Sequence, residues 1–213
     1  FCATERLFRS SYLNFLVQQW LPQLSGVVEQ LQMGAKVADI GCGHGLSTVL
    51  MAKAFPKSQF VGFDFHEASI EHARDLAKAQ DVTSNLSFDI ATAKNFPGSD
   101  YDLICAFDCL HDMGDPIGAA HHVKQALVPT GTFMVVEPFA EDNLADNLKP
   151  RARMAYAAST MACVPTSLAQ EIGLALGAQA GAAKMGEVLN AGGFSHVRKA
   201  YVDPNTTVLE VRP

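Results

Sequence analysis

The sequence predicts an α/β fold built on a doubly wound sheet of seven strands, mostly parallel, with an antiparallel pair at the end of the chain. Short apolar stretches alternate with amphipathic helical stretches, which is typical of parallel strands covered by helices on both faces. A glycine-rich turn, Gly41-Cys-Gly-His-Gly45, joins the first of these strands to the helix after it. Near the C-terminus, strand-forming residues 194–202 and 206–211 flank the tight turn Pro204-Asn205, which implies antiparallel pairing.

The first 34 residues form a predicted helical lead ahead of the domain at 35–213. Apolar and aromatic groups recur at helical spacing over residues 3–20, so we expect one amphipathic helix that ends near Pro22, and a second over 24–31. The lead either packs on the sheet or takes part in a dimer, and the sequence leaves both alternatives open. Because the chain begins at Phe1 within the first predicted helix, we also expect an upstream segment.

The glycine turn lies where a nucleotide-binding site is expected. Residues 35–40 form a short apolar strand that contains one acid, Asp39, and residues 46–55 form the helix after the turn. Glycine has no Cβ, so the backbone of such a turn can approach a ligand closely at a helix N-terminus. The next strand, 59–64, ends on Asp64, 21 residues after Gly43, which is the spacing that places a carboxylate on a ribose.

The spacing of the glycines distinguishes between cofactors. A dinucleotide fingerprint requires glycine or alanine at position 46, where this chain has Leu46. With Asp39 two residues before Gly41, the turn instead resembles the first motif of the class I S-adenosylmethionine-dependent methyltransferases. The resemblance implies a Rossmann-like fold, S-adenosyl-L-methionine as cofactor and S-adenosyl-L-homocysteine as product. A nicotinamide-dependent dehydrogenase is one alternative, and a regulatory domain that binds S-adenosylmethionine without transfer activity is another.

The remaining elements follow the same alternation of strand and helix. Asp115 is the expected N-cap of the helix that begins at Pro116. The predicted elements are a helix over 66–79, a strand over 85–88, a strand over 101–107, a helix over 116–128, a strand over 132–137 after the turn 129–131, and a helix over 185–191.

Residues 138–183 interrupt this alternation, because so long a connection is uncommon in a compact domain. We expect helices over 141–161 and 167–176, which make residues 139–180 a helical cap inserted over the active site. The alternative is additional helix packed on the edge of the sheet. In the cap interpretation, an apolar acceptor pocket is lined by Phe139, Met154, Tyr156 and Met161.

The candidate cofactor-binding residues lie at or just past the carboxyl ends of the predicted strands, where ligands of open α/β sheets bind. In the methyltransferase pattern an acid precedes the alanine that corresponds to Ala93, and here Thr92 takes the place of that acid. We therefore expect the Thr92 hydroxyl to accept a hydrogen bond from the adenine amino group. The predicted set is Asp39, Gly41, Cys42, Gly43, Asp64, Phe65, Thr92, Ala93, Phe107 and Asp108.

The segment Leu110-His-Asp-Met113 resembles the Leu-His-Asp-Trp signature of small-molecule O-methyltransferases, whose histidine is the base. The resemblance implies that His111 is the catalytic base and contacts the substrate, with Glu137 as the glutamate that flanks it. A second glutamate of that family is missing, because the corresponding stretch is Gln179-Ala-Gly181. The alternative role for His111 is to cap the following loop or shape the pocket. Bacterial relatives often carry an upstream winged-helix module that dimerises, which implies a homodimer formed through the N-terminal part.

The composition limits the possible partners. The net charge is −6, and no cluster of lysine and arginine occurs, so we expect no nucleic acid partner. The five cysteines form no C-x-x-C pair, which predicts reduced thiols and a cytoplasmic location. No apolar stretch is long enough for a membrane span, so no membrane partner is expected. His121-His122 has no nearby acid or cysteine at ligand spacing, and we predict no metal site.

Overall fold

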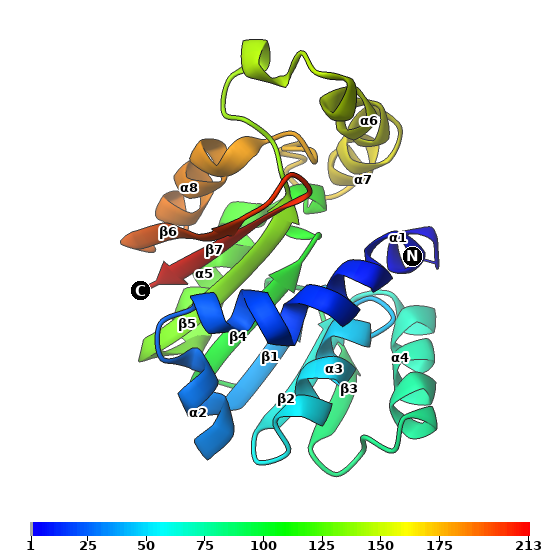
Figure 1. Cartoon of the computed structure of the whole chain (residues 1–213), viewed down its shortest axis with the longest axis vertical. Helices are drawn as coiled ribbons and strands as arrows, with labels where there is room; N and C mark the ends of the chain where they lie inside the picture. Colours follow the sequence, from blue (N-terminus) through cyan, green and yellow to red (C-terminus); the bar gives the residue numbers. More distant parts are fainter. Residues whose placement is uncertain (1) are drawn as a thin grey trace.

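The computed structural model describes residues 2–213, and the side chains of 4–150 and 152–213. Its seven strands form one sheet with the order β3-β2-β1-β4-β5-β7-β6 (Figure 1). The pairs among β1 to β5 are parallel, whereas β7 runs antiparallel to both β5 and β6, which confirms the predicted fold class. The strands are β1 Lys36–Ile40, β2 Gln59–Asp64, β3 Leu86–Ile90, β4 Tyr101–Phe107, β5 Leu127–Pro138, β6 His196–Val202 and β7 Thr206–Arg212.

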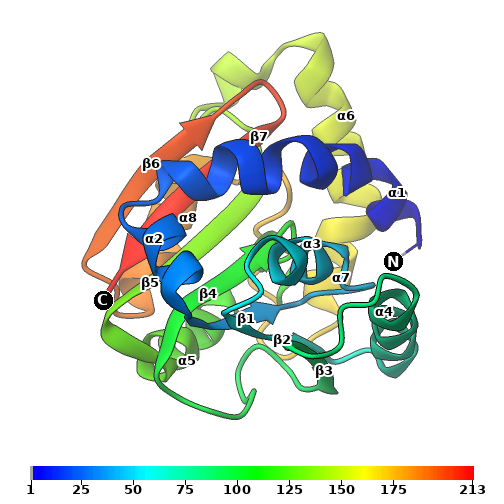
Figure 2. The ribbon, with the colours of Figure 1, turned by 60° about the horizontal axis from the view of Figure 1, so that its bottom comes forward.

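Helices cover both faces of the sheet (Figures 1 and 2). One hydrophobic core lies under the N-terminal lead, α3 and α4, and a second core lies under α5 and α8. Alternate residues of β1, such as Val37 and Ala38, enter opposite cores because successive side chains of a strand point to opposite faces. The α-helices are α1 Cys2–Ser11, α2 Val27–Met33, α3 Leu46–Ala54, α4 Glu67–Ala79, α5 Pro116–Ala126, α6 Pro150–Ala158, α7 Val164–Leu168 and α8 Gly181–Ala191.

The N-terminal lead packs on the sheet, which is one of the two alternatives left open by the sequence. It is not one regular helix, because α1 continues into a π-helix, η1 (Tyr12–Trp20), and a 3-10 turn, η2 (Leu21–Gln23). Tyr12, Leu16 and Trp20 form the buried stripe of η1. The second helix begins later than expected, at Val27, because Gly26 before it adopts a left-handed conformation.

The insertion differs from the expectation in both halves, and the helix expected over 141–161 begins only at Pro150. A 3-10 turn, η4 (Leu144–Asn147), and α6 lead into a π-helix, η5 (Ser159–Cys163), and then α7. The helix predicted over 167–176 is wrong, since α7 ends at Leu168. Ile172 and Ala175 have φ angles of 74° and 55°, which an α-helix does not allow. This irregular stretch returns to the sheet through a hydrogen bond from Gly177 N to the carbonyl of His111 at 3.2 Å.

Smaller differences concern strand ends. β5 begins at Leu127, so the residues predicted as a turn at 129–131 belong to the strand, with a register shift against β4 between Tyr101 and Leu103. Asp115 caps α5 as predicted, accepting a hydrogen bond from Gly118 N at 2.8 Å.

Among residues 2–213, no helix has the length and apolar character needed to cross a lipid bilayer.

Candidate functional site

A cavity of about 650 Å³ opens at the carboxyl ends of β1, β2 and β4. Its volume suits a ligand the size of a nucleoside derivative. Nine of the ten residues predicted to bind the cofactor line it: Gly41, Cys42, Gly43, Asp64, Phe65, Thr92, Ala93, Phe107 and Asp108. The sequence therefore located this cavity from the ends of the strands alone.

The glycine turn lines the cavity, and two of its glycines allow other parts of the chain to pack closely against its backbone. Gly41 and Gly45 have φ angles of 70° and 78°, which side chains disfavour. A Cβ at Gly41 would lie 2.8 Å from Cys109 Sγ, and one at Gly45 would lie 2.6 Å from the ring of Phe88. The turn thus has no room for a side chain at Gly41 or Gly45, and both glycines line the cavity.

Asp39 differs from the other predicted cofactor residues because it lies behind the turn and does not line the cavity. It is fully buried, and its Oδ2 accepts hydrogen bonds from Ser47 Oγ and Thr48 Oγ1, both at 2.7 Å. Burial raises the pKa of Asp39 to about 7, although both hydroxyls favour the charged form. In this structure Asp39 fixes the first turn of α3 against the glycine turn.

Asp64 and Phe65 provide a site suited to an adenosyl group. The two carboxylate oxygens of Asp64 each accept one backbone hydrogen bond at 2.9 Å, from Gly43 N and His66 N. Each oxygen retains a further lone pair for a ribose hydroxyl. Phe65 is 61% exposed and presents its ring at the cavity wall. The glycine cradle, the carboxylate and the aromatic ring together fit S-adenosylmethionine.

Near Thr92, the expected adenine contact, the cavity is lined by further residues that the sequence analysis did not predict. The Thr92 hydroxyl donates to Asn95 Oδ1 at 2.9 Å, which leaves a lone pair on its oxygen for a ligand. Next to it, Lys94 Nζ lies 3.2 Å from Asp115 and 3.0 Å from Glu171 of the insertion. All three line the cavity, so this ion-pair network connects the insertion to the cofactor-binding loop. Nothing in their sequence spacing indicated it.

The N-terminal lead forms another wall that was not predicted. Thr4, Glu5, Phe8 and Tyr12 line the cavity. Glu5 Oε2 lies 3.0 Å from Nδ1 of His44, and the hydrogen bond to His44 lowers the pKa of Glu5. His44 borders the cavity, as its place in the glycine turn suggested.

Tyr12 and Asp108 join the lead to the end of β4. The Tyr12 hydroxyl donates to Asp108 Oδ2 at 2.8 Å. Burial, and then the charge of Glu137, raise the pKa of Asp108 to about 8. Asp108 also has a φ of 51°, a left-handed conformation that is uncommon for residues other than glycine.

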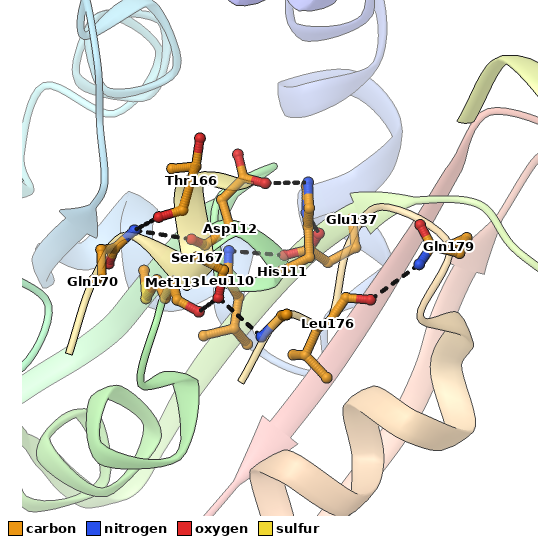
Figure 3. A network of polar contacts seen from close by, with 11 residues as sticks. Leu110, His111, Asp112, Met113, Glu137, Thr166, Ser167, Gln170, Leu176 and Gln179 are labelled. Atoms are coloured by element: carbon orange, nitrogen blue, oxygen red, sulfur yellow. Dashed lines mark hydrogen bonds and ion pairs between the residues drawn. The ribbon is translucent and has the colours of Figure 1, made fainter. Parts of the chain in front are cut away.

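His111 and Glu137 are brought together as predicted, because β4 and β5 are neighbours in the sheet. His111 Nδ1 forms a hydrogen bond with Glu137 Oε2, while Leu110 N donates to Glu137 Oε1 at 3.0 Å (Figure 3). Burial lowers the pKa of His111, but the charge of Glu137 and hydrogen bonds to its neighbours outweigh burial. The pKa of His111 is therefore raised well above its ordinary value.

The second ring nitrogen of His111 faces Asp112 and Cys163. Nε2 lies 3.1 Å from Asp112 Oδ1, and the Cys163 thiol of η5 belongs to the same cluster (Figure 3 shows the Asp112 contact). His111 is 4% exposed and does not line the large cavity, whereas Asp112 does. The predicted base is thus oriented by Glu137 but separated from the cavity by Asp112.

The insertion reaches the cavity, but not through the residues predicted to form the acceptor pocket. Phe139, Met154, Tyr156 and Met161 do not line the cavity, and Met154 and Met161 are 70% and 83% exposed. Phe139, Met154 and Tyr156 precede η5, whereas the part of the insertion that lines the cavity begins at Ala162, at the end of that turn. The insertion contributes Ala162, Thr166, Gln170 and Glu171 instead, at a spacing of four residues for the first three.

Two groups of side chains have the types and proximity of metal ligands, although the sequence predicted no metal site. The ligand atoms of Glu5, His44 and His72 lie within 4.8 Å of one another, and so do those of His111, Asp112 and Cys163. The first group bridges α1, the glycine turn and α4, and the second surrounds the predicted base. His121 and His122 belong to neither.

The comparisons with known proteins agree with this geometry. A family model described as a methyltransferase domain matches residues 31–193. Norajmaline N-methyltransferase of Rauvolfia serpentina is 32% identical over 117 residues, 53% of this chain and 39% of that protein. The 27-O-demethylrifamycin SV methyltransferase of Amycolatopsis mediterranei is 31% identical over 111 residues, 51% of this chain and 40% of that protein. This chain therefore spans less than half the length of these two relatives.

Solved structures share the fold at low sequence identity. An O-methyltransferase from neocarzinostatin biosynthesis, in complex with S-adenosyl-L-homocysteine and 1,4-dihydroxy-2-naphthoic acid, superimposes with a TM-score of 0.71 at 15% identity. The match covers 99% of this chain and 56% of that one. An O-methyltransferase family protein from Burkholderia thailandensis gives a TM-score of 0.70 at 18% identity, over 99% of this chain and 57% of that one.

Proposed function

This chain belongs to the S-adenosylmethionine-dependent methyltransferases of the methyltransferase-domain family, and we propose that it methylates a hydroxyl group of a small molecule. The observation that carries the proposal is the Glu137–His111 pair, held at the end of β4 beside the cofactor cavity. A hydroxyl acceptor must lose a proton, and a histidine fixed by a carboxylate is suited to receive it.

The cofactor supplies an electrophilic sulfonium methyl when bound, so the chain contributes position, a dry pocket and a base. Asp64 and the glycine turn, which line the cavity, would hold the ribose end of the cofactor, and Phe65 and Thr92 would contact its adenine ring. The insertion at 139–180 covers the acceptor side with Ala162, Thr166 and Gln170. In this arrangement the acceptor provides the nucleophilic oxygen, and His111 receives the proton that this oxygen loses.

Glu137 orients His111 and stabilises the imidazolium that forms when the acceptor loses its proton. The bond to Glu137 fixes the proton of the neutral ring on Nδ1 and leaves Nε2 as the basic nitrogen. A hydroxyl acceptor and a small-molecule substrate also agree with the name of the Amycolatopsis relative, a 27-O-demethylrifamycin SV methyltransferase. A homodimer formed through the N-terminal part and a cytoplasmic location stay predictions.

Two measurements test the proposal. Calorimetry with S-adenosylhomocysteine and with NADH compares the expected cofactor with that of the dehydrogenase alternative, and we expect binding of the first alone. Methyl transfer from isotopically labelled S-adenosylmethionine to a panel of phenols, enols, amines and carboxylic acids then tests the acceptor class. Methylation of amines in preference to hydroxyls would contradict the proposal. Tight cofactor binding without transfer to any acceptor would favour the regulatory alternative.

A further inference from the structure

His111 does not line the large cavity. It is 4% exposed and lines a small separate hollow between β5, β7 and α8. On its other side, Asp112 and Cys163 surround Nε2. A proton that leaves an acceptor in the cavity therefore has to pass one of these neighbours to reach the ring.

Asp112 is the neighbour that contacts His111 and also lines the cavity. Its Oδ1 lies 3.1 Å from His111 Nε2, while its side chain is 37% exposed and lines the cavity (Figure 3). The imidazole ring is the only polar partner of this buried oxygen among the described residues. The carboxylate of Asp112 therefore lies between the cavity and the ring of His111.

The backbone around Asp112 is held by hydrogen bonds from both sides of its turn. Asp112 N donates to Cys109 O at 3.1 Å, and Gln170 Nε2 of the insertion donates to the Asp112 carbonyl at 3.1 Å. Gln170 Oε1 accepts from Gly114 N at 3.0 Å, which clamps the same turn from its other side. The turn thus presents one carboxylate at a set position between the cavity and the ring.

Other acids on the cavity wall are engaged elsewhere. Asp115 and Glu171 share the ammonium group of Lys94. Asp108 accepts the hydroxyl hydrogen of Tyr12. Of these wall acids, Asp112 is the one whose nearest polar partner is the ring of His111.

We infer that Asp112 is the catalytic residue that touches the acceptor hydroxyl and passes its proton to Nε2 of His111. The inference rests on the proposed function. In the step, the acceptor O–H bond breaks as its proton moves to the Asp112 carboxylate, and a proton moves from that carboxylate to Nε2. The acceptor oxygen forms the O–CH3 bond, the S–CH3 bond breaks, and its electron pair stays on sulfur. The new imidazolium lies between the carboxylates of Glu137 and Asp112.

This arrangement determines how the rate depends on pH. The groups that face the ring are Glu137 at Nδ1, Asp112 and Cys163 at Nε2, and Asp108 nearby. The ring must be neutral to receive a proton, so the single-turnover rate rises with pH until His111 has lost its proton. Replacement of Asp112 removes one carboxylate from the ring, and His111 then titrates at lower pH.

The test compares Asp112→Asn and Asp112→Glu with Asp89→Asn, which changes an exposed acid on β3 outside the cavity. With an acceptor that the wild-type chain methylates, we expect Asp112→Asn to lose about 10²- to 10⁴-fold in single-turnover rate. Its affinity for S-adenosylhomocysteine stays within about twofold of wild type, and NMR shows His111 titrating at lower pH. Asp112→Glu recovers part of the rate, and Asp89→Asn stays within a few-fold of wild type.

A rate for Asp112→Asn within a few-fold of wild type, with His111→Gln strongly impaired, would overturn the relay and leave the proposed function standing. Failure of the wild-type chain to methylate any acceptor would instead overturn the proposed function and the relay with it. If Asp112→Asn does not fold, Asp112→Glu and Asp112→Ala decide between the same outcomes. Equal rates for Glu and Ala at this position would contradict the relay, because alanine has no group that can take up the acceptor proton.

Discussion

Tyr12 donates its hydroxyl hydrogen to Asp108, 96 residues later in the chain, at 2.8 Å in the wall of the cofactor cavity. This bond joins the N-terminal lead to the strand end that precedes the predicted base. Tyr12 also makes an edge contact with Phe107, with ring centroids 5.6 Å apart. The lead is therefore part of the cofactor site as well as part of the hydrophobic core.

Tyr12→Phe removes the hydroxyl and leaves a buried oxygen of Asp108 without its partner. We expect a loss of about 1–3 kcal/mol in the free energy of unfolding, since an unsatisfied buried polar group has that cost. Urea denaturation measures it. Tyr201→Phe is the matched control, because the Tyr201 hydroxyl bonds Asp203 at 3.1 Å near the surface and should change stability by less than about 1 kcal/mol. Equal effects of the two substitutions would contradict the assigned role of the Tyr12 bond.

The stability of the ligand-free protein should fall as pH rises from about 5 to 8. The pKa of Asp108 is raised to about 8, and that of Asp39 to about 7, so the folded state holds protons that the unfolded state has released. Stability from such groups is complete below the ordinary carboxyl range and is lost as pH approaches the raised value. Thermal unfolding from pH 5 to 8.5 measures this slope. Asp108→Asn should flatten it while Asp89→Asn, an exposed acid on β3, leaves it unchanged; a slope that survives Asp108→Asn in full would refute this assignment.

Asp64→Ala should weaken the binding of S-adenosylmethionine. A charge-assisted hydrogen bond to a ribose hydroxyl contributes about 1.5–3 kcal/mol, which corresponds to roughly 10- to 150-fold in the dissociation constant. Isothermal calorimetry on the folded variant measures it, with Asp89→Ala as the control at an exposed carboxylate outside the cavity. Unchanged affinity in a folded Asp64 variant would show that the ribose lies elsewhere.

Gly45→Ala and Gly186→Ala make a matched pair that tests the glycine turn. Gly45 has a φ of 78°, and its Cβ would lie 2.6 Å from the ring of Phe88, so the substitution should destabilise the fold and weaken cofactor binding. Gly186 lies in α8, where an added Cβ would have no atom within 4 Å, and alanine there should stabilise by up to about 1 kcal/mol. Thermal unfolding of both variants gives the comparison. A Gly45→Ala protein as stable as wild type would mean that the turn adapts to a side chain.

The sheet and the cofactor cavity could be predicted because they depend on local patterns. Alternating strands and helices set the topology, and strand ends placed nine of the ten expected cofactor residues on one cavity wall. The pairing of His111 with Glu137 followed from the order of β4 and β5. The glycine turn and the strand ends needed only local sequence patterns, whereas the pairing of His111 with Glu137 also needed the strand order that the family resemblance implies.

Features that depend on distant packing could not be predicted. The π-helical turn Ser159–Cys163 shifts the face of the insertion that reaches the cavity, and left-handed residues such as Ile172 end the helix predicted there. Tyr12 and Glu171 enter the cavity wall from opposite ends of the chain, and no spacing records such contacts. Asp39 matched the cofactor motif, yet burial turned its carboxylate toward Ser47 and Thr48.

His111 is the proposed final acceptor of the substrate's proton, and Glu137 is the group that orients its ring. His111→Ala should therefore lose about 10²- to 10⁴-fold in the single-turnover rate of methyl transfer, because a positioned base contributes on that scale. Its dissociation constant for S-adenosylmethionine should stay close to the wild-type value, since His111 does not line the cofactor cavity. Rapid-quench measurement of that rate, with calorimetry on the same variant, tests the claim most directly. A rate within a few-fold of wild type at unchanged cofactor affinity would mean that transfer proceeds by proximity alone, without proton transfer to His111.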